Sequence, residues 1–270
     1  MGLCPTPSCD IDIIPYIYHF RTNLLKISVI FDIIYKGEKM KNKNLKEMLI
    51  GIGVVLSYFI YSYFQIVPLT LVGIDYNSLS ISNKVIYLLI TEFIYLIILF
   101  VIFKKTFQKH FKKFKDNFKN YFKNYMQYWA LAFSLMLISN FIILSLFPNS
   151  VATNQEIVTY NFMVAPAYMF ISAVIFAPFL EETIFRLGFR KIFKNDILFI
   201  IMSGLVFGGL HVINSFENLV DLIYIIPYSI PGFVFAYTLV KSKNIFVPIG
   251  LHFFHNGIMM TIQMVLLFFL

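Results

Sequence analysis

Charged side chains are scarce in this chain, and their scarcity excludes most soluble folds. Asp, Glu, Lys and Arg make up 13% of the 270 residues, which is about half the fraction found in a soluble domain. Hydrophobic residues make up 59% of the sequence. They form long continuous runs rather than the alternating pattern of a membrane β-barrel. The sequence therefore predicts an all-α fold, a polytopic bundle of membrane-spanning helices.

Cysteine is almost absent as well, and acidic residues are outnumbered. Cys4 and Cys9 are the two cysteines, and the sequence has no Cys-x-x-Cys pair or other zinc spacing. Lys and Arg number 22 against 14 Asp and Glu, a formal net charge of +8. In a membrane protein this excess is typical of cytoplasmic loops that face anionic headgroups, so nucleic acid is not an expected partner.

Residues 1–39 lack a clean apolar span of about 20 residues, because charged side chains are scattered through them. They also lack the basic start, apolar core and cleavage site of a signal peptide. A basic stretch typical of the start of a membrane protein begins at Met40, and the preceding Lys36-Gly37-Glu38 can be encoded as a ribosome-binding site. We therefore expect translation to start at Met40, the alternative being a genuine amphipathic extension.

The sequence after Met40 predicts seven membrane-spanning helices. The expected spans are residues 48–71, 84–103, 125–147, 163–182 (extending to about 193), 196–214, 219–240 and 245–268. Lys and Arg cluster before the first span and after the second, fourth and sixth, whereas 72–83 and 148–160 contain none. The positive-inside rule therefore predicts a multi-pass protein of the cell membrane, with a cytoplasmic N-terminus and an external C-terminus.

A basic segment lies between the second and third spans. Residues 104–124 combine eight lysines with phenylalanines at every third or fourth position. This spacing predicts a Lys/Phe-rich amphipathic interfacial helix on the inner membrane surface. Anionic lipids are its expected partners.

Ionisable side chains interrupt three of the later apolar runs. Such side chains are costly in hydrocarbon, so they indicate a functional site. The three motifs are Glu181-Glu182-x-x-x-Arg186, Phe207-x-x-x-His211 and His252-x-x-x-Asn256. We expect His255, inside the third motif, to be a hydrogen-bonded core residue.

The spacing within each motif places its outer positions on one helix face. Glu182 and Arg186 are four residues apart and can form an ion pair. Glu181 projects about 100° away from Glu182 and can face a cavity. At about 1.5 Å per residue the motifs reach similar depths, so we expect them to meet within the membrane. Gly204 and Gly208, also four residues apart, predict a close helix–helix approach.

The three motifs resemble those of the CAAX-protease and bacteriocin-processing (CPBP, or Abi) family of intramembrane endopeptidases, over roughly residues 160–262. The resemblance divides the chain into an extension (1–39), membrane helices with the basic segment (40–159) and protease-like helices (160–270). It implies that Glu181 and His211 activate the attacking water, and that His252 and Asn256 stabilise the oxyanion. The residues that orient this set would be Glu182, Arg186 and Phe207.

The resemblance leaves open whether the mechanism uses a metal ion, since members of the family are also described as metalloproteases. Zinc held by Glu181, His211 and His252 is therefore the alternative to a metal-free mechanism. We expect no cofactor, because the sequence has no His-Glu-x-x-His motif. In addition, Asn256 can support His252, but His211 has no obvious partner for its second ring nitrogen.

Three classes of function remain open at this stage. The first is an endopeptidase that cuts a membrane-embedded peptide or protein. The second is an acyl- or lipid-modifying membrane enzyme of the same fold. The third is a non-catalytic protein, either a bacteriocin-immunity or scaffold protein or a small transporter, although no inverted repeat supports a transporter.

Overall fold

The computed structural model describes residues 42–148, 150, 152–213 and 219–268. The expected start at Met40 and the extension 1–39 lie outside the described residues. The chain divides into two compact units, Met1–Leu45 and Lys46–Leu270. The second unit contains the candidate site and is described here by itself.

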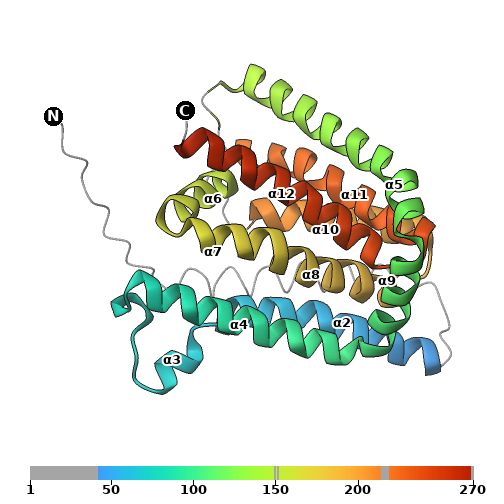
Figure 1. Cartoon of the computed structure of the whole chain (residues 1–270), viewed down its shortest axis with the longest axis horizontal. Coiled ribbons are helices and arrows are strands. Elements are labelled where there is room, and N and C mark those ends of the chain that lie inside the picture. Colours follow the sequence, from blue (N-terminus) through green and yellow to red (C-terminus); the bar gives the residue numbers. More distant parts are fainter. Residues whose placement is uncertain (1–41, 149, 151, 214–218, 269–270) are drawn as a thin grey trace. The chain divides into compact units, whose positions relative to one another are not determined.

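Every regular element of the described residues is a helix, and seven of these helices are long and apolar enough to cross a membrane (Figure 1). The prediction of an all-α polytopic bundle is therefore confirmed. The spanning elements are α2 (Asn42–Phe64), α4 (Ile81–Ile102), α5 (Lys104–Leu146), the line α7 to α9 (Pro166–Ile192), α10 (Asp196–Ile213), η4 with α11 (Leu219–Ser242) and α12 (Phe246–Phe268). The short helices are α3 (Val67–Leu71), η1 (Tyr76–Ser78) and α6 (Thr153–Val164).

The first span is shorter than expected. α2 ends at Phe64, and a separate helix, α3, begins at Val67. Pro68 lies in the first turn of α3. Because proline has no N–H, it cannot continue the hydrogen bonding of α2, but it fits the start of a new helix.

The basic segment and the third span form one helix, α5, of 43 residues. Non-helical angles at Asn117 (φ −124°, ψ 17°) mark a kink in it. Before the kink, the rings of Phe107 and Phe114 lie 5.7 and 5.9 Å from that of Phe246 at the start of α12. The predicted aromatic face is thus in part an interface within the protein, while the lysines of the segment are exposed.

Small residues bring α10 and α11 close together, as the spacing of Gly204 and Gly208 predicts. A Cβ atom added at Gly204 would lie 2.1 Å from the Phe233 ring. One added at Gly208 would lie 2.1 Å from the hydroxyl of Ser229 and 2.6 Å from its backbone nitrogen. This approach positions the face of α10 that carries the second motif.

The helix with the two glutamates is irregular. It runs through α7 (Pro166–Ile171), η2 (Ser172–Phe176), α8 (Ala177–Glu182), η3 (Thr183–Gly188) and α9 (Phe189–Ile192). Both η2 and η3 are π-helical turns, which often occur at functional sites. In Figure 1 this line lies between the α2–α4 pair and the group formed by α10, α11 and α12.

Candidate active site

A buried ion pair forms the base of the site. Glu182 Oε2 lies 3.0 Å from Arg186 Nε, and both side chains are fully buried. Arg186 Nη1 donates to Ser203 Oγ at 2.9 Å, and Ser203 donates to the carbonyl of Phe185 at 2.7 Å. The guanidinium also lies 4.9 Å from the centre of the Phe207 ring. The i,i+4 pair predicted from the sequence is thus present. Two residues of α10, Ser203 and Phe207, contact its arginine.

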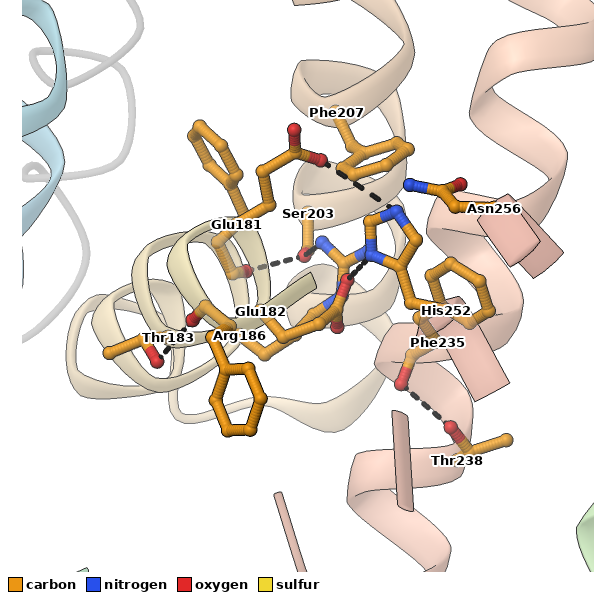
Figure 2. A network of polar contacts seen from close by, with 12 residues as sticks. Glu181, Glu182, Thr183, Arg186, Ser203, Phe207, Phe235, Thr238, His252 and Asn256 are labelled. Carbon is orange, nitrogen blue, oxygen red and sulfur yellow. Dashed lines mark hydrogen bonds and ion pairs between the residues drawn. The ribbon is translucent and has the colours of Figure 1, made fainter. Parts of the chain in front are cut away.

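His252 on α12 contacts both glutamates. Figure 2 shows the carboxylates of Glu181 and Glu182 directed at different nitrogens of its ring. Nδ1 lies 3.0 Å from Glu182 Oε1, and Nε2 lies 3.9 Å from Glu181 Oε2. The imidazole stacks on Phe235 with centroids 4.9 Å apart. Since an ionised carboxylate can only accept, Nδ1 donates to Glu182, and this bond sets the orientation of the ring.

The two glutamates differ in exposure. The side chain of Glu182 is 0% exposed, whereas that of Glu181 is 20% exposed. Among the described residues, Glu181 Oε2 has no hydrogen-bond partner. This oxygen is buried and lies 3.9 Å from His252 Nε2, so Glu181 faces the histidine and keeps a hydrogen-bond acceptor that the Arg186 ion pair does not use.

His211 is held by the backbone of its own helix. Its Nδ1 lies 2.9 Å from the carbonyl oxygen of Phe207, and its ring stacks on Tyr228 with centroids 5.1 Å apart. A carbonyl can only accept, so Nδ1 carries the proton and Nε2 carries a lone pair. The expectation that His211 has no partner for its second nitrogen was wrong. The partner is a backbone oxygen one turn earlier, which side-chain spacing does not reveal.

Asn256 connects α12 to the glutamate helix. Its Nδ2 donates to the carbonyl of Ala173 in η2 at 2.8 Å. We expected Asn256 to support His252, but Glu182 fills that position. Asn256 instead joins the last span to the turn that precedes Glu181.

Phe207 lies between the two histidines of the motifs. Its ring centroid is 4.8 Å from that of His211 and 5.7 Å from that of His252. His255 faces another way, packed edge-on against Phe133 and Phe235. One residue of each motif, Arg186, His211 and His252, thus lies beside the Phe207 ring, while His255 is buried in the core.

The choice between a zinc site and a metal-free mechanism stays a prediction. Over the part of the chain that the structure describes, no three His, Cys, Asp or Glu side chains form a group that could hold a metal ion. Of the three candidate ligands, Glu181 and His252 lie 3.9 Å apart, and the Phe207 ring lies beside both His211 and His252.

Two residues of the site were missed by the sequence analysis. Ser203, which receives the guanidinium of Arg186, precedes Phe207 by four residues and so extends the polar face of α10 by one turn. That spacing was a usable signal. Phe235, which stacks on His252, is one aromatic among many in α11, and the sequence does not distinguish it.

Comparisons with known proteins cover the same region. Residues 163–258 match the family model described as type II CAAX prenyl endopeptidase Rce1-like. A relative from Bacillus subtilis (strain 168), named "Putative membrane peptidase YdiL", is 27% identical over 114 residues. The alignment covers 41% of this chain and 43% of that relative, so it spans less than half of either protein. No solved structure matches the chain.

Proposed function

We propose that this chain is an intramembrane endopeptidase, because residues 163–258 match the type II CAAX prenyl endopeptidase Rce1-like model and 114 residues align with a relative named as a membrane peptidase. Its substrate would be a membrane-associated peptide or protein, in which it hydrolyses a peptide bond. The observation that carries the proposal is the position of Glu181. Its side chain is partly exposed in a membrane-spanning helix, and its carboxylate lies 3.9 Å from His252. Behind it, the buried Glu182–Arg186 pair holds the histidine in place.

Glu181 and His211 are the proposed bases. Glu181 has a carboxylate oxygen without a hydrogen bond among the described residues, and the Nε2 lone pair of His211 can also accept a proton. A water molecule loses a proton to this pair while its oxygen bonds to the scissile carbonyl carbon. The proton then passes to the amide nitrogen as the carbon–nitrogen bond breaks. The products are a new carboxyl terminus and a new amino terminus.

His252 and Asn256 are the proposed oxyanion donors. Since Nδ1 of His252 is bonded to Glu182, an N–H at Nε2 requires the imidazolium form. In that form the formal charges of Glu181, Glu182, Arg186 and His252 cancel. Asn256 carries two amide N–H groups, one of which is bonded to the backbone. We assign the second N–H to the oxyanion, because donors held in fixed positions stabilise the charge that develops on it.

The test is a comparison of membrane proteomes with mapping of chain termini. Cells that produce the wild type should contain a cut membrane peptide or protein that remains intact with Glu181→Ala. Glu156→Ala, at an exposed acidic residue of α6, is the control and should resemble the wild type. Identical termini in all three samples would refute the proposal. An acylated or lipid-modified product without cleavage would favour the transferase alternative.

A further inference from the structure

A further intramembrane carboxylate, besides Glu181 and Glu182, contacts the glutamate helix from outside the matched region. Glu92 lies on α4, and its Oε1 accepts hydrogen bonds from the hydroxyls of Tyr168 at 3.0 Å and Ser172 at 2.8 Å. None of the ion pairs among the described residues involves Glu92, and its Oε2 is buried there without a hydrogen bond. A carboxylate is costly in a membrane span, so its presence indicates a role beyond packing.

Ser172 is the first residue of the π-helical turn η2. The N–H of Ala177 bonds to the carbonyl of Ser172, five residues earlier. In this register the next carbonyl, that of Ala173, would face the nitrogen of residue 178. That residue is Pro178, which has no N–H. The Ala173 carbonyl is thus left without its helical donor, and the side chain of Asn256 bonds to it instead.

These contacts form one chain of hydrogen bonds across three spans. Glu92 accepts a hydrogen bond from the hydroxyl of Ser172, and the carbonyl of the next residue, Ala173, accepts one from Asn256. The same turn leads directly into α8, which carries Glu181. We infer that Glu92 is a positioning residue that fixes η2 and thereby sets the places of Asn256 and Glu181. The effect of Glu92 on catalysis rests on the proposed function, whereas its effect on the position of η2 does not.

Other polar contacts of α4 serve a different helix. Tyr95 shares a hydrogen bond of 2.8 Å with Ser57 on α2, and Thr91 accepts from Gln65 at 2.9 Å. These contacts join α4 to α2 and do not reach η2. Tyr95→Phe is therefore a matched control, because it weakens the packing of α4 without touching the glutamate helix.

The first measurement is hydrogen–deuterium exchange of the purified full chain in detergent. Glu92→Ala should raise exchange in the peptides that cover residues 172–182, because η2 loses the contact through Ser172 and the preceding α7 loses the one through Tyr168. Glu92→Gln should exchange like the wild type, since its amide oxygen can accept the same two bonds. Tyr95→Phe should leave this segment unchanged.

The second measurement is turnover of a synthetic peptide that spans a cleavage site mapped by the proteomic comparison. Glu92→Ala should lower kcat about tenfold or more with KM within about twofold, because misplaced catalytic groups slow the chemical step. Glu92→Gln should keep at least about half of the wild-type kcat for the same reason. If Glu92→Ala is not recovered folded, Ser172→Ala replaces it in both measurements.

Three results would overturn the inference. The first is unchanged exchange together with unchanged kcat in Glu92→Ala. The second is a Glu92→Gln variant as defective as Glu92→Ala, which would make the carboxyl an acid or base. The third is a change confined to KM, which would indicate substrate binding. A wild type that cuts no membrane peptide would refute the proposed function alone, and the exchange data would still decide the positioning role.

Discussion

Neighbouring glutamates in this protein have different surroundings and therefore different expected roles. Glu182 is enclosed by a cation and an imidazole, whereas Glu181 keeps one carboxylate oxygen without a hydrogen bond among the described residues. A substitution that keeps shape but removes basicity should separate the two roles.

Glu181→Gln should lower turnover about 100-fold or more, because a general base typically contributes a factor of this size. The melting temperature in detergent should stay near that of the wild type, since Glu181 is partly exposed and has no direct salt partner among the arginines and lysines described. Turnover of the mapped peptide and thermal unfolding check the two parts. Full activity in this variant would remove Glu181 as the base.

Glu182→Ala and Arg186→Ala should each destabilise the protein by about 3–5 kcal/mol, because each leaves an unpaired charge in a buried site. The double variant should be more stable than the sum of the two losses predicts. Unfolding midpoints and membrane abundance of the four proteins form the double-mutant cycle. Strictly additive losses would mean that the two side chains do not interact.

For single residues, the sequence predicts contacts between side chains better than contacts of a side chain with the backbone. The i,i+4 spacing was sufficient for Glu182 and Arg186. The partners of His211 and Asn256 are carbonyl oxygens. Every residue has a carbonyl, so the sequence does not show which ones the helix geometry leaves available.

Helices α10 and α11 provide the clearest test at the scale of elements. Gly208→Ala would place a methyl group 2.1 Å from Ser229 Oγ, so the two helices must separate. We expect a loss of about 1–3 kcal/mol, together with reduced turnover, because Phe207 and His211 are on the same helix. Thermal unfolding in detergent measures the first effect.

Gly53→Ala on α2 is the matched control for this prediction. A Cβ atom added there has nothing within 4 Å, and alanine favours a helix by up to about 1 kcal/mol relative to glycine. Equal destabilisation by the two substitutions would contradict the close approach of α10 and α11.

Most elements were predictable from apolar runs, but their irregularities were not. Pro68 lies in the first turn of α3, where we expected the first span to continue, and Pro178 lies in the first turn of α8, directly after the π-helical turn η2. Both irregularities lie beside a proline, which has no N–H for an earlier carbonyl. Binding of anionic lipids to the eight lysines of residues 104–124 stays a prediction.

Membrane topology is a property of the whole molecule. The seven spans and the alternating basic loops predict a cytoplasmic N-terminus and an external C-terminus. A reporter fused after Leu270 should therefore be active outside the cytoplasm, and one fused after Lys243 should be active inside. A reporter after Leu270 that works only in the cytoplasm would refute this orientation.

Metal dependence is also tested on the intact protein. If Glu181 and His211 activate water without a metal, exhaustive chelation should leave turnover of the mapped peptide unchanged, and the purified protein should lack stoichiometric zinc. Each ligand of a zinc site would have to be deprotonated, so metal binding would depend on pH. Loss of turnover on chelation, restored by zinc and not by magnesium, would favour the zinc mechanism over the metal-free one.

The bond between Asn256 and Ala173 has a consequence for biogenesis. Asn256 and His252 both lie on α12, which leaves the ribosome after the other described helices. Until α12 enters the membrane, the Ala173 carbonyl lacks its donor and Glu182 lacks its histidine. On the proposed function, a nascent chain that still lacks α12 therefore has no complete hydrolytic centre.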